Sequence, residues 1–162
     1  MSKPRKKKYV PKPCRLGGGL RVLLKIEDRA IASAPMTDDQ QTDLAGGYML
    51  ALTNLAIGNA SEESWECVVC ALNIGMALAE TTFEGQYEAE FVAALDGLFR
   101  AKIRSMKTGN YRLDGDGLNA VKIAIAVHDE QLKLAQRKEV IGALRIVQQR
   151  VKEGNVYRME PS

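Results

Sequence analysis

Apolar side chains recur along this sequence at the spacing of an α-helix. The first clear stretch begins near Asp38, with Thr37 or Asp38 as its N-cap, and ends at Gly58-Asn59. Inside it, apolar residues follow one another by four, four and three positions, so they share one face of a helix. These residues are Leu44, Tyr48, Leu52 and Leu55.

Four further stretches show the same periodicity. The second helix is expected to start at Ser61, and the third to run from Tyr87 to Gly109. The fourth is expected to start at Asp114 and to break near Gln136, after which the fifth ends at Gly154. The third helix is expected to bury a stripe made of Tyr87, Phe91, Leu95, Leu98, Phe99, Ile103 and Met106. The stripe of the fourth helix has heptad-like spacing, which suits a core or a dimer equally well, and consists of Leu118, Val121, Ile125, His128 and Leu132.

These patterns predict an all-α protein that folds as a compact bundle of about five helices. Strands are not expected, because residues with high strand propensity form no run of period-two alternation. The 162 residues suffice for one domain of ordinary size. We therefore expect a flexible arm over 1–19, one helical domain over 20–156, and a frayed tail over 157–162.

The net charge of +3 conceals two segments of opposite sign. Residues 1–25 contain nine Lys and Arg and no acid, whereas the rest of the chain has 14 Lys and Arg against 20 Asp and Glu. Pro4, Pro11 and Pro13 oppose a helix in the arm, and the glycines at 17–19 follow as a flexible joint. Disorder is expected up to about Gly19.

The basic arm is the strongest functional signal, because a dense cationic segment binds phosphates and releases their counterions. Tyr9 adds an aromatic ring that can stack on a base. A solubilising tail and a handle for an acidic protein are the competing interpretations, and the arm also matches the weak pattern of a nuclear localisation signal. The predicted phosphate-binding residues of the arm are Lys3, Arg5, Lys6, Lys7, Lys8, Lys12 and Arg15.

A second basic cluster lies at the end of the third helix and just beyond it. Arg100, Arg104 and Lys107 are its predicted nucleic-acid contacts, with Lys102 and Arg112 nearby. Cations there also suit the negative end of the helix dipole. Lys and Arg of the final helix are compatible with either a solvated face or a phosphate-binding face, and include Arg137, Lys138, Arg145, Arg150 and Lys152.

Acidic residues crowd into the first half of the helical body, which is the basis of an alternative function. An acidic surface of this kind fits a protein that inhibits or adapts a host complex. Acids at helix starts are also ordinary, because the dipole favours them there. The residues are Asp38, Asp39, Asp43, Glu62, Glu63, Glu66, Glu80, Glu84, Glu88 and Glu90.

Candidate chemistry is sparse. Cys67 and Cys70 form a CxxC pair inside an apolar helical stripe, where two small core residues are a better interpretation than a redox or metal site. With Cys14 in the arm and His128 as the single histidine, four zinc ligands are hard to assemble. The Asp114 loop lacks the ligands of a calcium site and is expected to be a turn and helix cap. We predict no catalytic residue, no metal and no cofactor.

The chain shows neither an export signal nor an apolar stretch long enough for a membrane span, so we expect a cytoplasmic protein. Four segments, the KPRKKKYVPKP arm and residues 64–73, 127–132 and 151–156, resemble small uncharacterised proteins of proteobacterial phages and prophages. That resemblance implies an accessory role in a bacterial or phage cytosol. It favours nucleic acid over nuclear import as the role of the arm.

Overall fold

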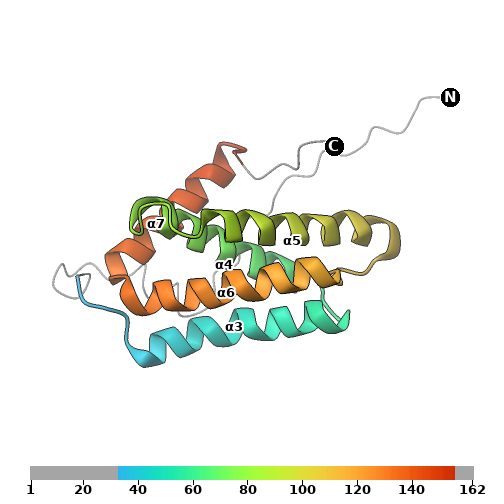
Figure 1. Ribbon diagram of the computed structural model, residues 1–162, viewed down its shortest axis with the longest axis horizontal. Coiled ribbons are helices and arrows are strands. Elements are labelled where there is room, and N and C mark those ends of the chain that lie inside the picture. The colour runs from blue at the N-terminus through green and yellow to red at the C-terminus, as the bar shows by residue number, and fades with distance from the viewer. Residues whose placement is uncertain (1–32, 156–162) are drawn as a thin grey trace.

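The computed structural model describes residues 33–155, and its helices pack side by side as an all-α bundle (Figure 1). Within that range there are five helices, and the one β-type contact is an isolated antiparallel bridge between Pro35 and Gln136. The predicted fold class is confirmed. The predicted arm and tail lie outside the described residues, as does most of the stretch at 20–34.

Helix α3 spans Asp38–Ile57 and α4 spans Glu62–Thr81. The N-cap of α3 is Thr37, whose hydroxyl accepts from the amide of Gln40, while the Gln40 side chain accepts from the Thr37 amide in return. Gly58 ends α3 in the left-handed region at φ 80°, where glycine has no Cβ to clash. Ser61 caps α4, as the sequence predicted.

Helix α5 spans Glu88–Thr108, α6 spans Gly115–Leu134 and α7 spans Arg137–Lys152. The predicted break near Gln136 and the capping role of Asp114 are both confirmed, since the Asp114 carboxylate accepts from the Gly117 amide at 2.6 Å.

The predicted apolar stripe of α5 is wrong at its two ends. Tyr87 lies just before the helix in a left-handed conformation and is exposed, and Ile103 and Met106 are exposed as well. The last turns of α5 are instead buried through Ala101 and Ser105, because small side chains there allow neighbouring elements close approach.

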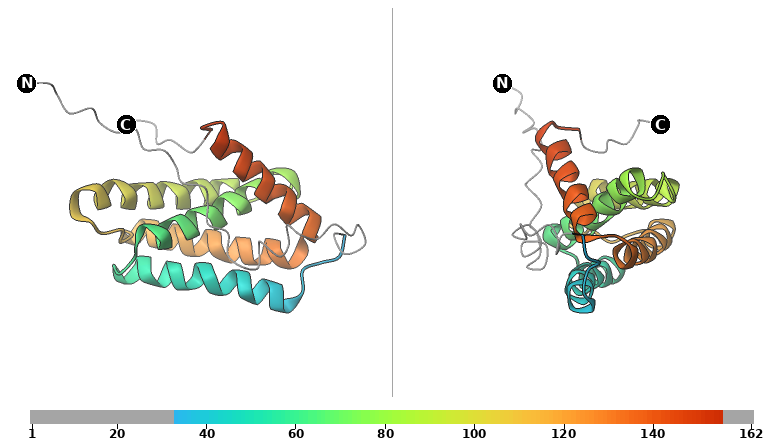
Figure 2. Two further views of the ribbon diagram at one scale, coloured as in Figure 1. Left: turned by 180° about the vertical axis from the view of Figure 1, so that it is seen from behind. Right: turned by 90° about the vertical axis from the view of Figure 1, so that its left-hand side faces the viewer.

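Helix α4 forms the centre of the fold and packs against α3, α5, α6 and α7. The two views of Figure 2 show α7 crossing the long axis of the other helices at one end. The core is built around fully buried side chains, the largest of which are Phe91, Leu55, Leu72, Leu78, Leu98 and Leu144. The stripe of α6 contributes Val121, Ile125, His128 and Leu132 to this interior, so it serves the core of the chain.

Candidate nucleic-acid interface

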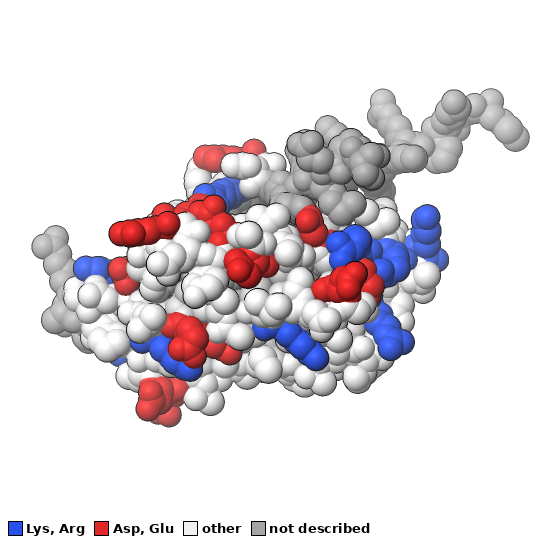
Figure 3. Space-filling view, in the orientation of Figure 1, with Lys and Arg blue, Asp and Glu red and all other residues white. Residues whose placement is uncertain are grey.

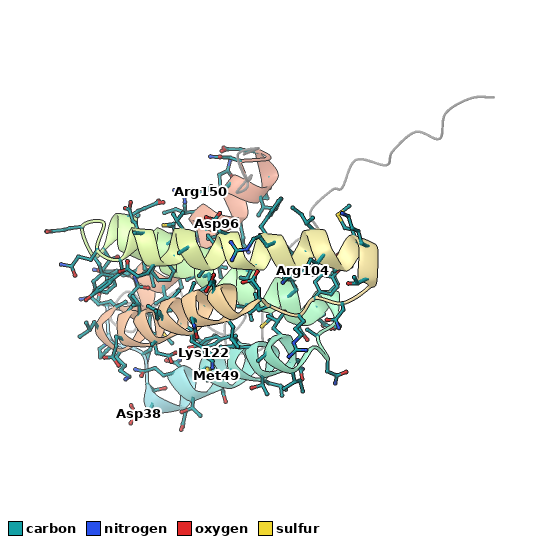
Figure 4. The ribbon with its side chains drawn as sticks, turned by 45° about the vertical axis from the view of Figure 1, so that its right-hand side comes forward. Asp38, Met49, Asp96, Arg104, Lys122 and Arg150 are labelled. Atoms are coloured by element: carbon teal, nitrogen blue, oxygen red, sulfur yellow. The ribbon has the colours of Figure 1, made fainter. Side chains whose placement is uncertain are left out.

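The predicted basic cluster of the body lies where α5 ends, the loop 109–114 turns, and α6 begins. Figure 3 shows basic side chains gathered over this end of the molecule and acidic ones more frequent toward the other. In Figure 4, Arg104 lies near the α5 terminus, whereas Asp38 lies at the opposite end of the bundle. On the face shown, basic side chains are concentrated at the end of the bundle where α5 ends and α6 begins.

Asp114 binds two of the three predicted phosphate contacts. Its Oδ2 accepts from Nε of Arg100 and from Nη1 of Arg104, both at 3.1 Å, and its Oδ1 accepts from Nη2 of Arg100 at 3.2 Å. The hydrogen bond from Arg100 is the main reason why the pKa of Asp114 lies well below its usual range. One carboxylate thus offsets part of the charge of two guanidinium groups.

This ion-pair network also braces the loop that follows α5. Arg104 Nη2 donates to the carbonyl of Arg112 at 2.7 Å, while the amide of Arg112 donates to the Asn110 side chain at 2.8 Å. Asp114 was expected to be a cap and turn residue, and its role as a shared partner of two arginines was missed. The available signal was the spacing of Arg100 and Arg104, which places both on one helical face four residues apart.

Lys102, in the same sequence cluster, faces inward. Its ammonium contacts Glu62 Oε1 at 2.7 Å and the hydroxyl of Tyr111 at 3.1 Å, and it lies over the rings of Trp65 and Tyr111 at 5.2 and 5.1 Å. Burial lowers the pKa of Lys102, but Glu62 and Tyr111 more than offset this, so its pKa is raised. Lys102 is thus engaged with Glu62 and Tyr111 inside the bundle.

Lys107 and Arg112 are exposed, and no ion pair formed within residues 33–155 includes either of them. Lys107 was predicted as a nucleic-acid contact, and the structure leaves its side chain accessible. Arg112 lies at the same end of the bundle, close to Gly58. The two are the exposed cations of the cluster that enter none of the ion pairs formed within residues 33–155.

The predicted contacts in the arm lie outside the described residues. They are Lys3, Arg5, Lys6, Lys7, Lys8, Tyr9, Lys12 and Arg15.

Some Lys and Arg side chains of α7 contact other residues of the chain, and others are exposed to solvent. Arg150 makes a two-pronged contact with Glu80 of α4, with distances of 3.2 and 2.5 Å, and Arg137 Nε donates to Gln40 at 3.1 Å. The three cations spaced by seven residues, Lys138, Arg145 and Lys152, are exposed.

Most acids of the alternative surface stand where helix geometry favours them. The first turns of α3, α4 and α5 hold Asp38, Asp39, Glu62, Glu63, Glu88 and Glu90. Glu62 and Glu80 pair with cations of this chain. Asp38, Asp39 and Asp43 are exposed on α3 and enter none of the ion pairs formed within the part of the chain that the structure describes.

The cysteine pair does not form a dithiol site. Cys67 carries a free, partly buried thiol, and burial raises its pKa, with a smaller contribution from the charge of Glu63. Cys70 is buried in the core, and because Cys67 is a free thiol the two are not joined to one another. The expectation of two small core residues is met by Cys70, which is buried, whereas Cys67 is only partly buried. Among residues 33–155, no group of three or more His, Cys, Asp or Glu is placed to hold a metal ion.

His128 lies in the core at 3% exposure, and its Nδ1 has no hydrogen-bond partner. Burial is the main cause that lowers its pKa to about 4, although Gln131 and Asp129 oppose the shift. Gly75 permits this packing, because a Cβ there would lie 2.4 Å from the ring of Phe91 and 3.2 Å from Nδ1 of His128. The histidine is a buried core residue that is neutral near pH 7.

A polar contact borders this histidine. The hydroxyl of Tyr48 donates to Oδ1 of Asp129, and burial, followed by this bond, places the pKa of Tyr48 well above its usual range. Gln131 Nε2 donates to the carbonyl of Gly75 at 3.1 Å. These bonds tie α6 to α3 and α4, which is a packing role.

Comparison of the chain with protein-family models, with curated proteins and with solved structures finds no match. None of the helices between residues 33 and 155 has an apolar stretch that would allow it to cross a membrane.

Proposed function

We propose that this protein is a non-enzymatic accessory factor that binds nucleic acid without sequence specificity. The observation that carries the proposal is the accessible pair Lys107 and Arg112, which lies at one end of a bundle whose chain also begins with a dense basic segment. Exposed cations without internal partners gain most from a phosphate, because they need not give up an existing ion pair. The arm supplies most of the charge and the body end adds a second contact.

Ion pairs within the chain reduce the number of predicted residues that are expected to bind phosphate strongly. Arg100 and Arg104 share Asp114, so together with it they add one net positive charge. Their part in binding is consequently smaller than that of Lys107 or Arg112. A cytoplasmic accessory role in a bacterium or phage, which the sequence led us to expect, is part of this proposal.

The test is the salt dependence of binding to generic duplex DNA and single-stranded RNA. Each phosphate contact contributes about 0.7 to 0.9 to the slope of log K against log salt. Deletion of residues 1–19 removes seven Lys and Arg, and should reduce the slope by the contribution of several phosphate contacts. A Lys107→Gln, Arg112→Gln double variant of the full chain should reduce it by about 1 to 2.

A matched control exchanges two exposed cations of α7, Lys138→Gln and Arg145→Gln, which removes the same charge elsewhere on the molecule. The slope should change less for this control than for the Lys107 and Arg112 pair. Unchanged affinity after deletion of the arm would refute the proposal. If the two double variants reduce the salt slope equally, the proposed contribution of Lys107 and Arg112 to nucleic-acid binding is refuted.

The alternative is a protein that inhibits or adapts a host complex through its acidic surface. The exposed carboxylates of Asp38, Asp39 and Asp43 favour it, because none of them enters an ion pair formed within residues 33–155. Affinity capture from a bacterial lysate treated with nuclease distinguishes the two. Recovery of a basic protein that is lost on charge reversal of α3 supports this alternative.

A further inference from the structure

The outer face of α3 carries a regular stripe of exposed residues. Helix α3 lies at the edge of the bundle, as the end view in Figure 2 shows, and its inner face buries Tyr48, Leu52 and Leu55. On the opposite side, exposed residues follow at spacings of four, three, four, three and four. This α3 stripe consists of Asp39, Asp43, Gly46, Leu50, Thr53 and Ile57.

The centre and the end of the α3 stripe are apolar although they face solvent. Leu50 is 66% exposed and Ile57 is 64% exposed, and Met49 lies beside them at 45%. A Cβ built on Gly46 would meet nothing within 4 Å, so the backbone is open to close approach at that point. Alternating spacings of three and four are those of a helix that packs against another helix.

Charge along the α3 face is arranged with opposite signs at its two ends. Asp39 and Asp43 stand near the start of the helix, and neither enters an ion pair within the described part of the chain. At the other end, the Cδ of Arg112 would lie 3.2 Å from a Cβ on Gly58, the residue that caps α3. The face therefore begins with two carboxylates and ends at Gly58, against which the side chain of the exposed residue Arg112 packs.

We propose that the α3 stripe is the interface of a two-fold symmetric homodimer, in which α3 packs antiparallel to α3 of a second copy. The arrangement brings Leu50 against its counterpart near the axis. It places Asp43 of each copy near the Ile57 end of the other, where Arg112 lies. An isologous contact needs a surface complementary to itself, and reversal of α3 brings the carboxylate of Asp43 to the Ile57 end, next to the loop that holds Arg112. The inference does not rest on the nucleic-acid proposal, but the two share Arg112, which would pair with Asp43 of the second copy in the dimer and with phosphate in the nucleic-acid complex.

The test is sedimentation equilibrium of the full chain, without nucleic acid, over a concentration range of roughly 1 to 100 µM. The wild-type chain should dimerise, and Leu50→Glu should weaken the dimer by about tenfold or more, because it places two carboxylates at the axis. Leu134→Glu is the matched control, since Leu134 is 73% exposed at the end of α6 and lies off the stripe. This control should dimerise like the wild type.

A charge exchange tests the orientation. Asp43→Arg and Arg112→Asp should each weaken the dimer several-fold, and the double variant should recover it, because the exchanged pair attracts again in both symmetric contacts. Circular dichroism establishes that each variant remains folded. A chain that stays monomeric throughout the range, or a dimer insensitive to Leu50→Glu, overturns the proposal. Failure of the double variant to recover overturns the antiparallel register.

Discussion

Gly97 and Gly117 bring the backbones of α5 and α6 into direct contact. A Cβ built on Gly97 would lie 2.6 Å from the Cα of Gly117, closer than such atoms approach in proteins, and the converse distance is 3.1 Å. The obstacle is backbone, which cannot rotate away as a flexible side chain would. Since Asp114 caps α6 three residues before Gly117, this contact also fixes the position of the carboxylate that binds Arg100 and Arg104.

The first prediction concerns this contact. Gly97→Ala should lower the free energy of unfolding by about 2 to 4 kcal/mol, because α5 and α6 must separate to admit the methyl group. Gly142→Ala is the control, since Gly142 lies inside α7 with nothing within 4 Å of its Cβ position, and should stabilise by about 0.5 to 1 kcal/mol. Urea denaturation followed by circular dichroism measures both. Similar effects from the two substitutions would contradict the backbone contact.

The second prediction concerns the Asp114 carboxylate. Asp114→Asn keeps a side-chain oxygen for the α6 cap but removes the charge shared by two arginines. The free energy of unfolding should fall by about 1 kcal/mol, since the pairs are partly exposed. Nucleic-acid affinity should rise, with a salt slope steeper by about 1, because Arg100 and Arg104 are then available to phosphates.

Asp116→Asn is the control for this measurement, because Asp116 is an exposed carboxylate in the same turn that acts on Arg100 by charge attraction. Its effect on the salt slope should be smaller. Reduced affinity in Asp114→Asn, with the fold intact, would show that the two arginines act only when Asp114 positions them.

The third prediction is a pH dependence of stability caused by His128. The unfolded chain protonates this histidine near its ordinary pKa of 6.5, whereas the folded chain does so only at about 4. The unfolded state therefore binds the proton first, and stability is lost as the pH falls from about 6.5 toward 4. The full loss is about 3 kcal/mol, at 1.36 kcal/mol for each unit of pKa difference.

His128→Gln removes this contribution and should flatten the difference between unfolding free energies measured at about pH 7 and pH 4.5. Carboxylates titrate in both proteins and cancel in the comparison. The variant also loses core packing, so the measured quantity is the change with pH in each protein and not the absolute stability. Identical pH profiles for the two proteins would show that His128 does not titrate as its burial requires.

The sequence sufficed for the helices because each buried stripe repeats with the helical period and each end carries its own signal. Thr37, Ser61 and Asp114 cap as their side-chain chemistry predicts, and Gly58 ends α3 in the conformation that glycine favours. These signals are local. They do not depend on which helices become neighbours.

Features that depend on which helices become neighbours were harder to predict from the sequence. Ile103 and Met106 fit the period of α5 but remain exposed, because Ala101 and Ser105 supply the buried surface at that end. The sharing of Asp114 by Arg100 and Arg104 requires the loop 109–114 to return the chain to α5. Periodicity identifies one face of a helix but not the extent to which another element covers it.

The last prediction concerns Trp65, whose indole Nε1 donates to the carbonyl of Leu98 at 2.7 Å and whose ring lies below the ammonium of Lys102. Trp65→Phe retains an aromatic ring but loses this donor, which should lower the free energy of unfolding by about 1 to 2 kcal/mol. Tyr111→Phe removes only the hydroxyl that contacts Lys102 at 3.1 Å, and should cost less than about 1 kcal/mol because the Glu62 pair is retained.

Circular dichroism is the appropriate probe, since Trp65 is the single tryptophan and its substitution removes the fluorescence signal. A larger loss in Tyr111→Phe than in Trp65→Phe would mean that the Lys102 contacts, and not the indole hydrogen bond, hold α4 against α5.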